Sequence, residues 1–253
     1  DENDAKSMLI STVEKPFEIK KLNDEEVEFI KKKIVDIVMK ASCSYPFDLK
    51  TVIRKFNMIK YESIIEKIYL TYQTDKKEQG LSDFNDLMVL FGKFLDTKDG
   101  KNFIKNIDYV FFDEYQDVNP IQNYILSKFY KKSNIMAVGD DAQAIYSFRG
   151  SNIKYIHDFE KKFKPSKIYK LEVNYRSSPS IVNFCQNIIE NNVNQFQKKV
   201  EANQEKIGSK PQVICCEEND QYQWVINDIK KKINNGKKYS DMVVLARKNS
   251  SIN

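Results

Sequence analysis

The apolar positions of the first hundred residues recur mostly at the three- and four-residue spacing of an amphipathic helix. Asn23 or Asp24 can cap the first of these runs, and Ser82 can cap a later one. The predicted helices begin at residue 23 or 24, cover 49–58 and 60–79, and begin again after residue 82. Residues 1–20 show no clear period and contain Pro16, so we expect them to be irregular. The first hundred residues should therefore be mainly helical.

After Gly100 the pattern changes to short apolar runs that alternate with helical ones. The predicted strands cover 107–112, 135–138, 168–173, 211–216 and 242–246. The predicted helices begin at Asn119-Pro120 and cover 152–163, 178–191 and 220–234, and residues 194–210 are expected to form a polar loop. Strands that alternate with helices imply a parallel sheet with right-handed crossovers. The sequence therefore predicts an α/β fold preceded by a mostly helical region.

The composition is that of a soluble globular protein, with 41% hydrophobic and 30% charged residues. The apolar runs are too short to span a bilayer, and the first twenty residues lack the apolar core of a signal peptide. A zinc site is not expected, because the four cysteines have no CxxC spacing and there is one histidine. We interpret the cysteines as reduced thiols of a cytosol-like compartment and His157 as a surface residue.

The net charge of +5 arises entirely from residues 166–253. This bias is compatible with contact to a polyanion such as nucleic acid. A lysine-rich solvated surface explains the same bias without any partner. Charge alone therefore does not choose between these two interpretations.

Two adjacent carboxylates follow the first predicted strand, which we expect to be buried. The string reads YVFFDEYQD and places Asp113 and Glu114 at the end of the strand where α/β sheets bind ligands. Nucleotide hydrolysis needs one carboxylate to hold Mg²⁺ and another to orient or deprotonate the attacking water. The simpler alternative is a strand that ends in a solvated acidic turn.

A second polar string follows the next predicted strand and reads VGDDAQAIYSFRG. Gln143 offers a donor and an acceptor without charge, so it can report whether a γ-phosphate is present. Tyr146, Phe148 and Arg149 combine flat rings with a guanidinium, which suits stacking on unpaired bases and holding backbone phosphate. Alternatively, the two aromatic side chains belong to the core.

A third string, LEVNYRSS, ends the following strand and opens a helix. Arg176 at such an edge could reach a phosphate across an interdomain cleft, and Tyr175 could stack on a purine ring. The alternative is an ordinary strand-to-helix turn with an exposed arginine.

Together the three strings resemble motifs II, III and IV of superfamily 1 DNA helicases of the UvrD/PcrA/Rep type, in the same order. Two weaker similarities agree with this. LSDFNDL at 81–87 resembles the family's DFxDL stretch before motif II, and VVLARKN at 243–249 resembles the ILxRxN strand of its second motor domain. The resemblance spans roughly 81–253, and residues 1–80 match only in helical character. One departure is Phe148, where several relatives carry Trp.

The resemblance implies roles for the residues of each motif. Asp113 is then the Mg²⁺ ligand, Glu114 the catalytic base and Gln143 the γ-phosphate sensor. The implied DNA contacts are Tyr146 and Phe148 on single-stranded DNA, with Arg149 linking the DNA to the ATP site. Tyr175 stacks on adenine, and Arg176 acts as the arginine finger on the γ-phosphate.

The resemblance also implies a RecA-like fold with three parts. Residues 1–80 form a helical region like subdomain 1B, 81–165 the C-terminal part of motor domain 1A, and 166–253 the N-terminal part of motor domain 2A. The phosphate-cradling loop GxxxxGK[ST] is absent from the sequence. Because the chain opens with Asp1 and ends at Asn253, we expect a fragment that does not hydrolyse ATP at a helicase rate on its own.

The implied function is that of an ATP-dependent DNA helicase or translocase, moving 3′ to 5′ and using ATP and Mg²⁺. Its implied partners are single-stranded DNA and duplex junctions, in a cytoplasmic or equivalent reducing compartment and without a membrane. Two alternatives stay open. The chain could belong to the helicase half of a RecB/AddA-type nuclease, or to a non-catalytic paralogue that binds DNA.

Overall fold

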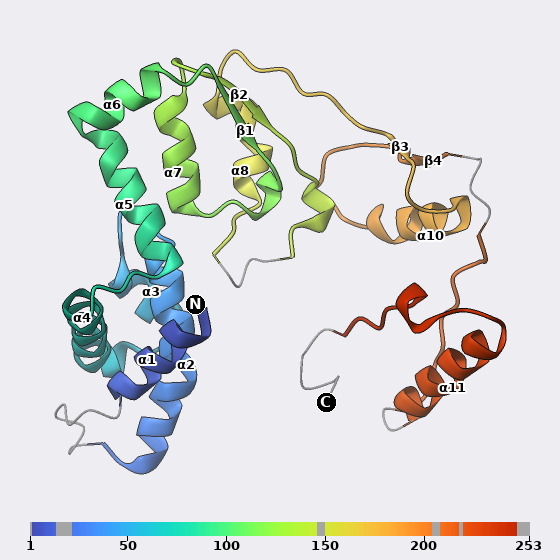
Figure 1. Cartoon of the computed structure of the whole chain (residues 1–253), viewed down its shortest axis with the longest axis horizontal. Helices are drawn as coiled ribbons and strands as arrows, with labels where there is room; N and C mark the ends of the chain where they lie inside the picture. The colour runs from blue at the N-terminus through green and yellow to red at the C-terminus, as the bar shows by residue number, and fades with distance from the viewer. Residues whose placement is uncertain (1, 14–21, 146–149, 204–207, 218–219, 247–253) are drawn as a thin grey trace. The chain divides into compact units, whose positions relative to one another are not determined.

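The computed structural model describes residues 2–13, 22–145, 150–203, 208–217 and 220–246 (Figure 1). The chain divides into two compact units. The first comprises Asp1–Leu171 together with Ile189–Lys199, and the second comprises Glu172–Ile188 together with Val200–Asn253. The short segment Ile189–Lys199 therefore packs with the first unit, although part of the second unit precedes it in the sequence.

The N-terminal part of the first unit is a helical cluster, as the apolar spacing predicts. Its helices are α1 (Glu2–Val13), α2 (Asp24–Ser42), α3 (Leu49–Lys55) and α4 (Glu62–Glu78). They bury one apolar stripe each in a common core that includes Leu9, Ile34, Ile53 and Ile65. Burying each of these side chains favours the folded state by roughly 1.5–3 kcal/mol.

The expected irregular start is wrong for Glu2–Val13, which form α1. Leu9 and Val13 are four residues apart and share one helix face, where they are 2% and 1% exposed. Helix α1 contacts both α2 and α4. A short helix of this kind is stabilised mainly by tertiary packing. The apolar periodicity of its sequence is weak, so the sequence alone did not predict it.

Capping residues fix where the helices begin. Asn23 caps α2, because its Oδ1 accepts from the N–H of Glu26 at 2.9 Å and the Glu26 carboxylate accepts from the N–H of Asn23. Ser82 does not cap the next predicted helix; Asp83 caps α5 (Phe84–Asp96). The reason is the position of Asp86, which completes a capping box with the residue three places before it.

A buried ion cluster joins α4 to the start of α5. The Lys76 side chain is 5% exposed, and its Nζ lies 2.7 Å from both Asp83 Oδ2 and Asp86 Oδ2. The hydroxyl of Tyr72 donates to Asp83 Oδ2 at 3.0 Å. Burial by itself raises the pKa of Asp83, but the hydrogen bonds from Lys76 and the Asp86 backbone outweigh it and lower that pKa overall.

The rest of the first unit surrounds a pair of parallel strands, β1 (Tyr109–Phe112) and β2 (Asn134–Ala137). Helix α7 (Pro120–Phe129) starts at the predicted Asn119-Pro120 step, with Asn119 as its cap. It packs against α5, next to α6 (Lys98–Lys105), which the sequence pattern did not predict. Gly92 permits the close approach of α5 and α7, since a Cβ there would lie 3.2 Å from the Cδ1 of Ile121.

The strand β1 is half-buried on one face and exposed on the other, which corrects the expectation of a buried strand. Val110 and Phe112 pack into the core, whereas Tyr109 and Phe111 are 64% and 73% exposed. The single helix predicted at 152–163 is also divided, into α8 (Lys154–His157) and α9 (Phe159–Lys162).

The second unit contains β3 (Val173–Asn174), α10 (Pro179–Ile189), β4 (Glu201–Ala202) and α11 (Asp220–Asn234). Strands β3 and β4 are parallel, and β4 falls in the segment predicted as a loop. The strands predicted at 211–216 and 242–246 are not formed, and their side chains Val213 and Leu245 are 78% and 86% exposed. A strand needs a partner for its backbone hydrogen bonds, and apolar content alone does not supply one.

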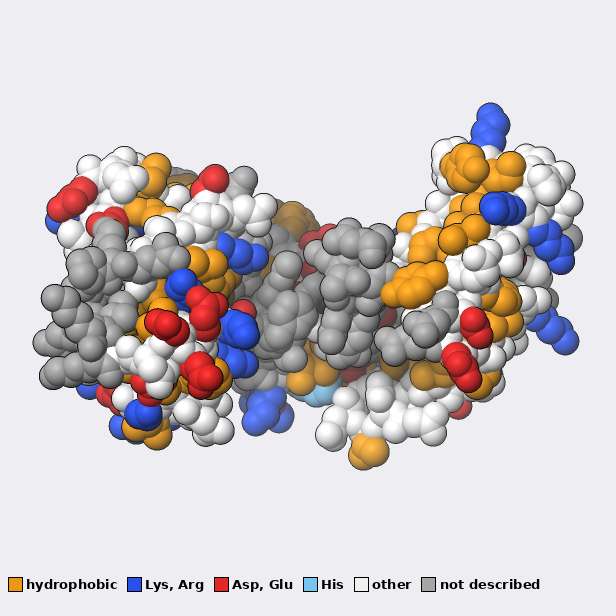
Figure 2. All heavy atoms as spheres, turned by 90° about the horizontal axis from the view of Figure 1, so that it is seen from below, with side chains coloured by type: hydrophobic (Ala, Val, Ile, Leu, Met, Phe, Trp, Pro, Cys, Tyr) orange, Lys and Arg blue, Asp and Glu red, His pale blue; other side chains and the backbone are white. Residues whose placement is uncertain are grey.

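Hydrophobic side chains lie open on the surface of the second unit, on the right of Figure 2. Among its described residues Val182 is the one buried hydrophobic side chain. The parallel strands and flanking helices of both units nevertheless confirm the predicted α/β class. In the described part of the chain, every helix is too short or too polar to cross a membrane.

Candidate active site

The first two polar strings start at the same edge of the sheet. Phe112 pairs with Ala137 in the parallel register, so Asp113 and Val138 both follow strand ends on one side. The N–H of Val138 donates to the carbonyl of Phe112 at 2.8 Å, and the N–H of Tyr115 donates to the carbonyl of Val138 at 2.8 Å. The structure therefore brings the DEYQD and GDDAQ strings together by backbone contacts.

Glu114 is held in an unusual backbone conformation at this edge. Its φ of 52° and ψ of 45° lie in the left-handed region, which residues other than glycine seldom adopt. The next residue anchors it, because Tyr115 is 1% exposed and its hydroxyl donates to Asn123 Oδ1 at 3.2 Å. Asp113 and Glu114 are both exposed, so their carboxylates are available to a ligand.

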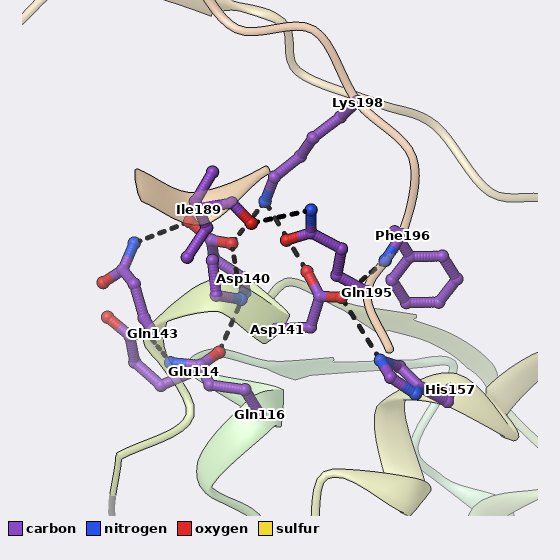
Figure 3. Close-up of polar contacts among 11 residues, drawn as sticks. Glu114, Gln116, Asp140, Asp141, Gln143, His157, Ile189, Gln195, Phe196 and Lys198 are labelled. Carbon is purple, nitrogen blue, oxygen red and sulfur yellow. Dashed lines mark hydrogen bonds and ion pairs between the residues drawn. The ribbon is translucent and has the colours of Figure 1, made fainter. Parts of the chain in front are cut away.

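Gln116 connects the two strings through its side chain (Figure 3). Its Nε2 donates to Glu114 Oε2 at 2.6 Å, and its Oε1 accepts from the N–H of Asp140 at 3.0 Å. The residue is 2% exposed. The sequence interpretation missed Gln116; the available signal was a neutral amide two places after a carboxylate.

Asp140 is the next link in this network. Its carboxylate accepts from Gln143 Nε2 at 2.9 Å and from the N–H of Ala142 at 3.1 Å, and it pairs with Lys198. Burial raises the pKa of Asp140, but hydrogen bonds from Lys198 and Gln143 lower it overall. Gln143 itself is exposed, with its amide beside Asp140. Glu114 and Gln143 are thus connected through Gln116 and Asp140.

The segment Ile189–Lys199, which packs with the first unit, contacts the two aspartates of this site, Asp140 and Asp141. The N–H of Phe196 donates to Asp141 Oδ2 at 2.6 Å, and Lys198 Nζ lies 3.7 Å from Asp141 Oδ1. His157 Nε2 lies 3.2 Å from Asp141 Oδ2, and its ring meets the Phe196 ring edge-on (Figure 3). The sequence suggested a surface residue; His157 is half-buried and contacts both Asp141 and Phe196. The sequence did not reveal Phe196 or Lys198 as members of this site.

The donors at this edge fit a magnesium ion held mainly by phosphates and water. Mg²⁺ in nucleotide sites is bound through one or two carboxylates, and Asp113 presents one at the end of β1. The described residues contain no group of three or more metal-ligating side chains, so Asp113 as a magnesium ligand stays a prediction. Asp117 Oδ1 is buried without a hydrogen-bond partner in the same turn, and burial together with Glu114 raises the pKa of Asp117.

Tyr175 and Arg176 belong to the second unit, in the turn between β3 and α10. Asn174 Oδ1 accepts from the N–H groups of Arg176 at 2.9 Å and Ser177 at 2.8 Å. This turn leaves both predicted site residues exposed. Their convergence on the edge that carries Asp113 stays a prediction. The predicted DNA contacts Tyr146, Phe148 and Arg149 lie outside the described residues.

Comparison with protein families finds two domain matches that follow one another along the chain. Residues 1–164 match the UvrD/REP helicase N-terminal domain, and residues 169–253 match the UvrD-like helicase C-terminal domain.

Curated relatives share a consistent level of identity with this chain. The YjcD protein of Bacillus subtilis, which its name assigns to the ATP-dependent DNA helicases, is 34% identical over 193 residues. The ATP-dependent DNA helicase PcrA of Staphylococcus aureus is 34% identical over 197 residues. Each alignment covers 75% of this chain but only 25% of YjcD and 26% of PcrA. The chain thus spans about a quarter of the length of these relatives.

Proposed function

Because this chain belongs to the UvrD/REP helicase family, we propose that it forms part of an ATP-dependent DNA helicase or translocase. That protein would couple ATP hydrolysis to movement along single-stranded DNA in the 3′-to-5′ direction and act at duplex junctions. Residues 1–80 would correspond to the helical subdomain 1B, 81–165 to the end of motor domain 1A, and 166–253 to the start of motor domain 2A. Residues from a longer chain would supply the phosphate-cradling loop.

One observation carries the proposal: the carboxylate pair and the glutamine turn meet at the C-terminal edge of two parallel strands. This edge is where α/β sheets bind nucleotides. Here the charges of Asp113, Glu114 and Asp140 are accompanied by two neutral amides, from Gln116 and Gln143. Such a combination suits a site that must hold a cation, orient a water molecule and sense a phosphate.

The residues would divide the chemistry as follows. Asp113 would hold Mg²⁺, which when bound supplies positive charge to the β- and γ-phosphates. Glu114 would orient the attacking water and accept its proton. Gln143 would hydrogen-bond the γ-phosphate as a sensor. From the second unit, Tyr175 would stack on adenine and Arg176 would stabilise charge on the transferred phosphoryl group.

The test is ATP turnover by the full-length protein with and without single-stranded DNA, with unwinding of partial duplexes that carry a 3′ or a 5′ tail. We expect DNA to stimulate turnover and the 3′-tailed duplex to be unwound. The 253-residue chain alone, which has no GxxxxGK[ST] string, should show no DNA-stimulated turnover. A full-length protein that binds DNA but hydrolyses no ATP would instead be a non-catalytic paralogue.

Replacing Phe148 or Arg149 by alanine should weaken binding of single-stranded DNA in two different ways. Loss of the Phe148 ring removes stacking on one base, which costs about 1–3 kcal/mol and leaves the salt dependence unchanged. Loss of Arg149 removes a phosphate contact, so the slope of log affinity against log salt should fall by about 0.7. Fluorescence anisotropy of a labelled oligonucleotide over a salt series separates the two. Equal slopes for both variants would contradict the assigned contacts.

A further inference from the structure

Gln116 lies buried between the proposed base and the turn that carries the proposed sensor. Its side chain joins Glu114 Oε2, 2.6 Å from Nε2, to the N–H of Asp140, 3.0 Å from Oε1 (Figure 3). Asp140 in turn accepts from Gln143 Nε2 at 2.9 Å. A continuous run of hydrogen bonds therefore leads from Glu114 to Gln143.

The chemistry of its partners fixes the orientation of the Gln116 amide. A backbone N–H can only donate, so the atom that faces Asp140 must be the amide oxygen. An ionised carboxylate can only accept, so the atom that faces Glu114 must be the amide nitrogen. Glutamine satisfies both partners at once. Glutamate would satisfy Asp140 alone, and methionine would satisfy neither.

The backbone at Gly139 leaves just enough space for the Gln116 side chain. A Cβ on Gly139 would lie 2.8 Å from Gln116 Oε1 and 3.1 Å from the Gln116 backbone nitrogen. The position next to Asp140 must therefore lack a side chain for the amide to reach it. Glu114 has an exposed side chain with several rotatable bonds, so a fixed partner is needed to restrict where its carboxylate points.

We propose that Gln116 is a positioning residue for ATP hydrolysis, which holds the Glu114 carboxylate and couples it to the turn of Gln143. This inference rests on the proposed function, because it takes Glu114 as the base. A change at Gln143 on binding or losing a γ-phosphate reaches Glu114 through Asp140 and Gln116. Such positioning acts on the chemical step and leaves nucleotide binding largely unaffected.

Two variants of the full-length protein test the proposal through the kcat and KM of DNA-stimulated ATP turnover. Gln116→Glu and Gln116→Met should each lower kcat roughly 10- to 100-fold, with the KM for ATP within about twofold of wild type. Both variants should melt earlier than wild type, because Gln116→Met leaves the N–H of Asp140 without an acceptor and Gln116→Glu buries a second carboxylate beside Glu114. The kcat of each is therefore measured at a temperature where circular dichroism shows the variant to be folded. A residue with a merely structural role would give wild-type kcat in the well-folded Gln116→Glu protein.

Gln122→Glu is the matched control. Gln122 Oε1 accepts from the N–H of Asn119 at 3.0 Å in the capping box of α7, a role that glutamate also fills. The same substitution six residues away should therefore leave kcat, KM and thermal stability unchanged.

A double-mutant cycle separates this inference from the function on which it rests. In a Glu114→Gln background, Gln116→Glu should lower kcat no further, because the group it positions is already disabled. An additional loss as large as in the wild-type background would overturn the proposal. Absence of DNA-stimulated turnover in wild type would sink the proposed function instead, and wild-type turnover in Glu114→Gln would sink the base assignment. Wild-type kcat in Gln116→Glu, with those two results as expected, would sink this inference alone.

Discussion

Replacing Glu114 by glutamine in the full-length protein should slow ATP turnover by about 10²- to 10⁴-fold while ATP binding persists. The substitution removes the proton acceptor and keeps the shape of the side chain. Glutamine at this position can still accept a hydrogen bond from Gln116 Nε2, and the left-handed backbone at φ 52° is equally demanding for both residues. The effect should therefore fall on the chemical step. Single-turnover hydrolysis and the affinity for a fluorescent ATP analogue measure the two quantities separately.

Glu160→Gln is the control for this experiment. Glu160 is an exposed residue of α9 in the same unit, so the same chemical change there should alter neither turnover nor affinity. Turnover at the wild-type rate in Glu114→Gln would mean that another group activates the water.

Replacing Lys76 by methionine should destabilise the first unit by about 3–5 kcal/mol. The change leaves Asp83 and Asp86 without the ammonium group that lies 2.7 Å from both. Methionine retains most of the apolar part of the lysine side chain. The decrease in the free energy of unfolding therefore measures the effect of removing the ammonium charge. Urea unfolding of the 253-residue chain, followed by far-UV circular dichroism, measures it. The one tryptophan, Trp224, lies in α11 of the second unit, so its fluorescence is not a direct probe of the first unit.

Lys77→Met provides the matched control, because Lys77 is the next residue of α4 and is exposed. Its substitution should change the free energy of unfolding by less than about 0.5 kcal/mol. Equal effects at positions 76 and 77 would show that the buried cluster contributes no more than a surface lysine.

The effect of Lys76→Met should also depend on pH. The pKa of Asp83 is lowered in the folded protein, so its paired, ionised form contributes stability above the unfolded pKa of about 3.9. That contribution is lost as pH falls through the lower folded pKa. The stability difference between wild type and Lys76→Met should therefore be full near pH 7 and shrink below about pH 4. A constant difference from pH 7 to pH 3 would contradict the role of Asp83.

Local signals in the sequence predicted the fold elements that depend on local chemistry. The Asn119-Pro120 step starts α7 because a cap followed by proline is a sufficient signal by itself. The apolar runs before Asp113 and Gly139 became paired parallel strands, since each is short, β-prone and followed by a turn. By contrast, 211–216 and 242–246 have equally apolar runs but no partner strand among the described residues, and they stay extended and exposed.

The candidate site divides in the same way. Asp113, Glu114 and Gln143 could be selected from their strings, because strand ends and residue types are visible in the sequence. The role of Gln116 could not, since it depends on the β1–β2 register that brings the N–H of Asp140 to its amide. The role of Lys198 was even harder to predict from the sequence, because Lys198 and Asp140 are 58 positions apart. Long-range contacts of this kind follow from tertiary packing and leave no local pattern.

Because Ile189–Lys199 packs with the first unit, the choice of boundaries matters when that unit is produced alone. A truncation after Leu171 would follow a natural-looking border yet remove Lys198 and the Phe196 N–H from Asp140 and Asp141. Two neighbouring negative charges would then face each other without their cation, next to the turn that carries Gln143. The first unit produced alone would therefore need these eleven residues, for example joined through a short artificial linker, to keep the contacts of Asp140 and Asp141 that the whole chain has.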